Sequence, residues 1–250
     1  MRWILTMLVF GFAAAAHAEW TLSSRNVTAT LPGGAEFIER EAKQGDGVVR
    51  VKGVFFTMKQ ARFAVSDNAE KISLGEAMKS TGALAGVNGN YFKADWTPVG
   101  LELAAGNPVH GFERAKLLSG VFVVTKGVPR IVRSGIYTSS KNDTDALQAG
   151  PFLVEKGAAI PGLNATRAAR RTVVATDGKG RWAILIFSPV TLAETADLLA
   201  SRAVFPDFPV VHALNMDGGS STALWVATEP RPFYYSEFGR VRNFLTIMPH

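Results

Sequence analysis

Short apolar runs that stop at turn signals recur along this chain and constrain its fold more than any other feature. The runs are rich in valine, isoleucine and phenylalanine and have the length of β-strands rather than of helices. We therefore expect strands over Val48–Thr57, Arg62–Ser66, Leu84–Asn88, Val99–Ala104, Gly120–Thr125, Val128–Val132, Phe152–Glu155, Thr172–Thr176, Arg181–Phe187, Val210–Leu214, Phe233–Tyr235 and Phe244–Met248. Asp177-Gly178-Lys179-Gly180 predicts a hairpin between two of them.

Helix signals are confined to two stretches. Ser73 with Glu76, and Thr191 with Glu194, match the capping box that opens a helix. These boxes predict helices that end near Thr81 and near Val204. Because strands and helices do not alternate regularly, a parallel doubly wound sheet is not expected. The predicted fold class is α+β: a single domain over residues 19–250, with a mixed, largely antiparallel sheet and a few covering helices.

The first eighteen residues have the organisation of a secretory signal peptide. A basic start, Met1-Arg2, precedes the apolar run Trp3–Phe12, and Ala16-His17-Ala18 is a small-residue cleavage signal. The apolar run is too short for a stable transmembrane helix, and no later stretch is long enough either. We expect cleavage near Ala18, no transmembrane segment in the mature chain, and an exported protein that is periplasmic or secreted.

Composition excludes several classes of chemistry. The chain has no cysteine, so thiol nucleophiles, thiolate metal sites and iron–sulfur clusters are ruled out. Its formal net charge of +6 fits either a basic soluble surface or attraction to an anionic substrate or envelope polymer. No run of like charge and no basic–aromatic pattern is present, so a nucleic-acid partner is not expected.

Four polar clusters fall at the ends of expected strands, where rigid scaffolds usually carry their sites. They are Asn88-Gly89-Asn90, Gln148–Pro151, Arg170-Arg171-Thr172 and Asn215–Ser221. Each cluster alone also has a structural explanation, such as a turn or a solvated arginine pair. Polar groups at the end of a buried strand are costly unless satisfied, which favours a role for Asn215 and Asp217.

Common hydrolase signatures are missing from the sequence. There is no G-x-S-x-G elbow around Ser220 or Ser221, no H-E-x-x-H and no phosphate-binding Walker loop. Beyond residue 18 the only histidines are His110, His212 and His250. We therefore predict no metal-binding residues and no cofactor, with a divalent cation left open as an alternative.

Taken in order, the clusters resemble a known family. Ala85–Phe92, Pro98–Leu101, Gly150–Leu153, Arg171-Thr172 and Ala213–Ser221 follow one another as in the phosphodiester glycosidase family. Met216 stands where leucine is usual, and a glycine that often precedes the serine is missing. The resemblance implies an exported hydrolase of glycosyl phosphodiester bonds, with sugar-1-phosphodiester substrates from envelope or extracellular glycans.

That chemistry needs a cation on the phosphate, because negative charge builds there as the phosphomonoester leaves. Arg171 is the candidate clamp and Arg170 the fallback, since neighbouring strand residues face opposite ways. Asp217 is the candidate catalytic carboxylate, either stabilising an oxocarbenium-like centre or activating water, and Glu102 is a second acid to test. The further substrate-binding candidates are Asn88, Asn90, Gln148, Thr172, Asn215, Gly218, Gly219, Ser220 and Ser221.

Two other functions stay open at this point. One is a non-catalytic glycan- or polymer-binding protein of the same fold. The other is a metal-dependent phosphodiesterase that uses Asp217 with further oxygen ligands.

Overall fold

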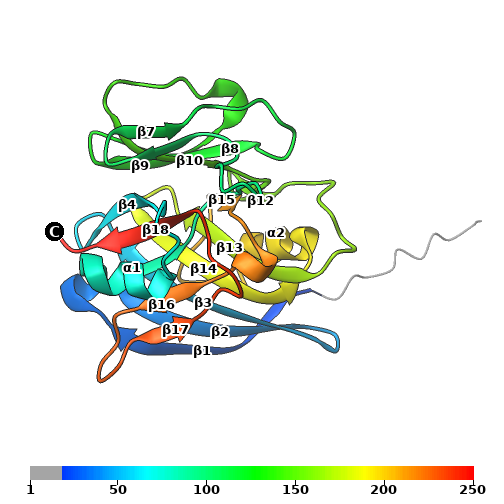
Figure 1. The fold of residues 1–250 in the computed structure, drawn as a ribbon. Coiled ribbons are helices and arrows are strands. Elements are labelled where there is room, and N and C mark those ends of the chain that lie inside the picture. The colour runs from blue at the N-terminus through cyan, green and yellow to red at the C-terminus, as the bar shows by residue number, and fades with distance from the viewer. Residues whose placement is uncertain (1–18) are drawn as a thin grey trace, which may run out of the picture.

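The strands of this protein form three antiparallel sheets (Figure 1). The computed structural model describes residues 19–250, so the predicted signal peptide lies outside the described residues. An eight-stranded sheet has the order β1 (Thr21–Thr30), β2 (Glu36–Gln44), β3 (Gly47–Thr57), β14 (Arg181–Val190), β13 (Ala169–Thr176), β15 (His212–Asn215), β11 (Phe152–Glu155) and β12 (Ala158–Ala159).

Two five-stranded sheets complete the fold. The β5 sheet has the order β17 (Phe233–Tyr235), β16 (Leu224–Val226), β5 (Ala85–Asn88), β18 (Asn243–Met248) and β4 (Arg62–Asp67). The β10 sheet has the order β7 (Asn107–His110), β6 (Glu102–Ala104), β10 (Asp143–Ala149), β8 (Gly120–Thr125) and β9 (Val128–Arg133). In Figure 1 the β10 sheet forms a layer at the top of the view.

Both predicted helices are present and begin at their capping boxes. Helix α1 (Leu74–Thr81) packs beside β5 and β16, and helix α2 (Leu192–Ala200) packs beside β11 and β12. In each, the cap hydroxyl accepts from the backbone of the glutamate three residues later, and that glutamate bonds back to the cap. Neither α-helix of residues 19–250 has the length and apolar character that crossing a bilayer would demand.

The predicted α+β class with largely antiparallel pairing is confirmed. Strand β9, which contains Pro129, lies at a sheet edge, where a residue without an N–H is tolerated. Six strands lie outside the expected ranges: β1, β2, β7, β10, β12 and β16. The side chains of β1 are mostly exposed, and β2 is rich in charge. An exposed edge strand carries no apolar alternation, so hydrophobic periodicity does not reveal it.

One aromatic cluster joins the three sheets. Phe63 of β4 lies between Phe56 of β3, Phe122 of β8 and Trp182 of β14, with ring centroids 5.0, 4.8 and 5.4 Å away. All four rings are nearly completely buried. This shared core fixes the β5 and β10 sheets against the eight-stranded sheet, and it thereby sets the positions of the loops at the strand ends.

Candidate active site

The polar end of β15 opens into a cavity of about 430 Å³. Its lining includes Asp217, Arg171, Asn215, Gly218, Gly219 and Ser220 from the predicted clusters, together with Tyr91, Leu117, Pro151, Asn164, Arg167, Ala169 and Leu192. The strand register explains why Arg171 and Asp217 meet here. Strands β13 and β15 are antiparallel, and their pairing ends with Val173 opposite Asn215. Arg171 and Asp217 each lie two residues beyond that pair, at the same end of the two strands, and both line this cavity.

Asp217 is held in place through its own peptide groups. Its N–H donates to the Gly89 carbonyl (3.0 Å), and its carbonyl accepts from Asn88 Nδ2 (2.7 Å). The carboxylate accepts from the Gly218 N–H (2.8 Å) and is also hydrogen-bonded by Ser221. Burial raises the pKa of Asp217 above its ordinary value, although these hydrogen bonds to the charged form oppose that rise. The site therefore presents a carboxylate that is more basic than one in water.

Arg171 is a buried cation without an acidic partner. Its Nε donates to the Val190 carbonyl (3.0 Å) and its Nη2 to the Arg167 carbonyl (2.7 Å), and within residues 19–250 it forms no salt bridge. Burial lowers the pKa of its guanidinium. By contrast, the buried arginines Arg40 and Arg242 pair with Asp207 and Asp67. A buried unpaired guanidinium at a cavity wall is a ready site for an anionic group.

Tyr91 and Asn215 form the floor between these two charges. The Tyr91 hydroxyl donates to the Gly150 carbonyl and accepts from Asn215 Nδ2 at 3.1 Å. Burial, with the neighbouring charge of Asp217, raises the pKa of the Tyr91 phenol, so it stays protonated. Asn215 Oδ1 is buried and has no hydrogen-bond partner. An acceptor left unsatisfied at a cavity floor can take a hydrogen bond from a ligand hydroxyl.

Asn88 and Thr172 lie behind the cavity wall and position it. Asn88 Oδ1 accepts from Thr172 Oγ1 (2.7 Å) and from the Ala223 N–H (3.1 Å), and its Nδ2 binds the Asp217 carbonyl. Both side chains are completely buried. Their hydrogen bonds join β5, β13 and the loop after β15. All the contacts of these two side chains are with other protein groups, so their role here is structural.

Arg170 faces away from Arg171, as alternation along β13 requires. Its Nε and Nη2 donate to the carbonyls of Gly219 (2.8 Å) and Ser220 (3.2 Å), and its guanidinium packs 4.0 Å from the Phe238 ring centroid. A Cβ at Gly218 would lie 2.8 Å from the Arg170 carbonyl oxygen, and Gly219 has φ +61°. Arg170 thus supports the Gly218–Ser221 turn from behind. The Gly218 N–H is engaged by Asp217, so it does not serve as a free anion-binding amide.

Ser221 does not line the cavity, like Asn88, Thr172 and Arg170, and three more predicted residues lie outside it. Glu102 is completely buried, where its carboxylate accepts from Asn243 Nδ2, and burial raises its pKa to about 7. Asn90 bonds the same Asn243 and the Val99 carbonyl. The side-chain amide of Gln148 binds the loop before β8: it accepts from the Glu113 N–H (3.0 Å) and donates to the Glu113 carbonyl (2.6 Å).

The cavity lining also includes four residues that were not predicted: Asn164, Arg167 and the apolar wall residues Leu117 and Leu192. Asn164 Oδ1 accepts from the Thr166 (3.2 Å) and Arg167 (2.8 Å) N–H groups, which curls this loop over the cavity. An asparagine two residues before such a turn is a recognisable signal, but it does not reveal which surface the loop covers. Among residues 19–250 no three His, Cys, Asp or Glu side chains gather as a metal site would require.

Solved structures share this fold. The catalytic domain of zebrafish N-acetylglucosamine-1-phosphodiester alpha-N-acetylglucosaminidase, auto-inhibited by its pro-peptide, matches with a TM-score of 0.64 at 15% identity, over 94% of this chain and 89% of that one. A hypothetical protein from Synechocystis matches with a TM-score of 0.58 at 16% identity, over 87% of this chain and 62% of that one. A candidate exported protein from Burkholderia pseudomallei K96243 matches with a TM-score of 0.51 at 12% identity, over 88% and 76%.

No curated protein matches the sequence. The family model described as phosphodiester glycosidase matches residues 81–248, which contain β5, β13, β15 and every residue of the cavity wall. This chain therefore belongs to the phosphodiester glycosidase family.

Proposed function

We propose that this protein is an exported hydrolase that cleaves glycosyl phosphodiester bonds. Its family supports the reaction class, and the zebrafish structural neighbour is named for a sugar-1-phosphodiester substrate. The observation that carries the proposal is a buried guanidinium without an acidic partner, Arg171, lining one cavity with the carboxylate of Asp217. A phosphodiester supplies the anion that Arg171 lacks and, on the same molecule, the sugar on which the Asp217 carboxylate acts.

In this proposal Arg171 holds the phosphate. Its Nε and Nη2 are fixed by the Val190 and Arg167 carbonyls, so the rest of the guanidinium has one orientation toward the cavity. When the bond between the sugar C1 and the phosphate oxygen breaks, the electron pair stays on that oxygen. A fixed positive charge stabilises this developing charge without reorganisation, and more strongly in a water-poor site.

Asp217 acts on the sugar side. Its ionised carboxylate either stabilises the oxocarbenium-like centre at C1 or takes a proton from the water that attacks C1. The hydrogen bonds from Gly218 and Ser221 keep the carboxylate aimed, and burial makes it the stronger base. Asn215 Oδ1 and the apolar walls of Leu117 and Leu192 provide contacts for the sugar. The products are a free sugar and a phosphomonoester.

The test is a screen of sugar-1-phosphodiesters, beginning with the methyl diester of N-acetylglucosamine 1-phosphate, with both products identified. Asp217→Asn keeps the Oδ1 acceptor for Gly218 and should lower turnover by at least about 1,000-fold, as losses of a catalytic group commonly do. Its melting temperature should stay near that of the wild type, because the backbone contacts of Asp217 are retained. Turnover retained by the variant would remove Asp217 from the mechanism.

The same screen decides between this function and its alternatives. Saturable glycan binding with no product after prolonged incubation would support a binding protein of the same fold instead. Loss of turnover in EDTA, restored by a divalent cation, would support the metal-dependent phosphodiesterase. Export is tested separately: expression of the full chain should yield an extracytoplasmic protein whose N-terminal residue lies near Glu19.

A further inference from the structure

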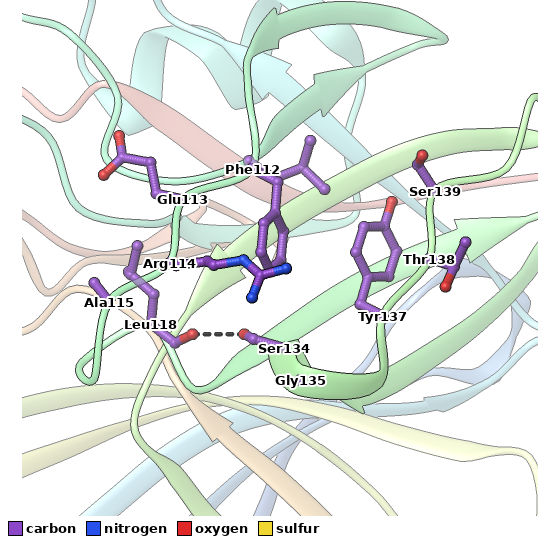
Figure 2. Close-up of a pocket in the computed structure, with 11 residues that line it drawn as sticks. Phe112, Glu113, Arg114, Ala115, Leu118, Ser134, Gly135, Tyr137, Thr138 and Ser139 are labelled. Atoms are coloured by element: carbon purple, nitrogen blue, oxygen red, sulfur yellow. Dashed lines mark hydrogen bonds between the residues drawn. The ribbon is translucent and has the colours of Figure 1, made fainter.

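A second cavity, of about 740 Å³, lies beside the β10 sheet (Figure 2). It is formed by the loop between β7 and β8, which contributes Phe112, Arg114 and Leu118, and by the segment after β9, which contributes Ser134 and Tyr137. None of these residues was among the sequence candidates. The side chains that line it are a mixture of aromatic, basic and hydroxyl groups.

The walls of this second cavity are held by partly buried hydrogen bonds. Gln148 binds both peptide groups of Glu113, which fixes the loop that carries Phe112 and Arg114. The Tyr137 hydroxyl donates to Asp143 (3.0 Å), and the Ser134 hydroxyl donates to the Leu118 carbonyl (2.5 Å). The site is therefore preorganised, and a ligand would not have to order it on binding.

Two features of the lining suit a charged sugar chain. The rings of Phe112 and Tyr137 are nearly parallel, with centroids 5.9 Å apart and an interplanar angle of 22°, and Phe112 is 39% exposed. The guanidinium of Arg114 points toward the centre of the cavity in Figure 2, whereas the carboxylate of Glu113 points away from it. Within residues 19–250, Arg114 forms no hydrogen bond or salt bridge, while Glu113 faces His110 at 3.7 Å.

One loop contributes to both the second cavity and the candidate active site. Leu117 lines the first cavity and Leu118, the next residue, lines the second. The segment that follows β10 also connects them: Gln148 orders the loop of the second cavity, and the Gly150 carbonyl accepts from Tyr91 and from Asn215 on the floor of the first. The two cavities are therefore held at fixed positions relative to each other by the same segments.

We propose that the second cavity is a subsite for a sugar of an oligomeric, phosphodiester-linked glycan, so that the substrate extends beyond the cleaved linkage. This inference rests on the proposed function. The apolar face of a sugar ring lies against the exposed aromatic pair, and Arg114 binds the next phosphate of the chain. Binding energy gained at this distance from the cleaved bond favours oligomers over single sugar phosphodiesters.

The test compares a short and a long substrate on the mature chain. The short probe is the methyl diester of N-acetylglucosamine 1-phosphate, and the long probe is a trimer of N-acetylglucosamine joined by 1→6 phosphodiesters. The double variant Phe112→Ala/Arg114→Gln should lower kcat/KM for the trimer by about tenfold, and for the methyl diester by less than about twofold. Equal losses on both probes, or no loss on the trimer, would overturn the subsite.

Controls come from the same two segments. Lys116→Gln removes a positive charge from the loop, and Ile136→Ala shortens an exposed apolar side chain, but neither residue lines the cavity. Both should leave the ratio of the two kcat/KM values unchanged. A ratio altered as much by these controls as by the double variant would show that the effect is not local.

A binding measurement separates failure of the subsite from failure of the proposed function. Calorimetry with Asp217→Asn should show the trimer binding more tightly than the methyl diester, and adding Phe112→Ala/Arg114→Gln should weaken trimer binding by about tenfold. If the wild type cleaves neither probe, the hydrolase proposal fails for this sugar. The subsite is then tested by the calorimetric binding measurement alone. Equal binding of both probes, or no binding, overturns it.

Discussion

At the residue scale, the buried polar side chains fall into two groups, according to whether protein groups satisfy all of their hydrogen bonds and charges. The amide oxygens and nitrogens of Asn88 and Gln148 all have backbone partners, so each side chain links separate segments of the chain. Arg171 has carbonyl partners but no acid, and Asn215 Oδ1 has no partner at all. Because unmet hydrogen-bonding capacity inside a protein is costly, its presence at one cavity indicates a ligand site.

Replacing Arg171 should separate stability from activity. Arg171→Met removes a buried, unpaired charge, which offsets the two lost hydrogen bonds, so the free energy of unfolding should change by less than about 1 kcal/mol. Turnover should be lost. The matched variant Arg40→Met breaks the contact with Asp207 and should cost about 2 kcal/mol, between the values for surface and fully buried pairs. Urea titration checks both; equal destabilisation would assign Arg171 to folding.

Removing the Ser221 hydroxyl should shift the pH dependence. Catalysis needs ionised Asp217, so the rate falls as pH drops through its pKa, which burial has already raised. The Ser221 hydrogen bond stabilises the ionised form of Asp217, so without it the pKa rises further and the acidic limb of kcat/KM moves to higher pH. Ser220→Ala, in an exposed side chain, should not move that limb. If the acidic limb of the Ser221→Ala variant lies at the same pH as that of the wild type, Asp217 is not the group whose ionisation causes the limb.

At the element scale, the site depends on strand pairing across the chain. The pairing of β13 with β15 brings Arg171 and Asp217 to one cavity, and Gly89, directly after β5, fixes the peptide of Asp217. Local signals predicted most of these elements. The capping boxes gave the starts of both helices, although α2 ends at Ala200 rather than near Val204. Propensity carries no information on where tertiary packing stops a helix.

Removing either capping box should lower stability by the same amount, but only one of the two changes should affect substrate binding. Ser73→Ala and Thr191→Ala each remove the side chain that caps a helix, and each should cost about 1 kcal/mol of stability. Only Thr191 precedes a cavity residue, Leu192, so only its variant should raise KM. Chemical denaturation and steady-state kinetics check this pair. A KM change in Ser73→Ala of the same size would show that the effect is global.

At the scale of the whole molecule, three sheets share one core. The cluster of Phe56, Phe63, Phe122 and Trp182 draws a side chain from every sheet, and each buried aromatic contributes several kcal/mol. The β10 sheet, which carries the second cavity, is thereby tied to the sheets that carry the first. The position of one cavity relative to the other follows from this packing.

Truncation in this cluster should destabilise the whole mature chain at once. Phe122→Ala leaves a cavity between the β10 sheet and its neighbours and should cost about 3–5 kcal/mol. If residues 19–250 are one domain, unfolding stays a single transition, merely shifted to lower temperature. Calorimetry checks this, with Phe112→Ala, an exposed aromatic of the same sheet region, as the matched control. A separate early transition would show that the β10 sheet unfolds by itself.

Apolar runs, capping residues and ordered motifs are local signals, so the sequence alone was enough to predict the family, the α+β class and both helix starts. It also named Asp217 and Arg171, which line one cavity. Tertiary structure decided the rest. It turned Arg170 away from the cavity, buried Glu102 and Asn90 elsewhere, and made Gln148 a support for a loop far from it in sequence. It also placed Arg114 beside an aromatic pair. Which polar groups are satisfied depends on contacts between distant segments, and only packing of the three sheets creates those contacts.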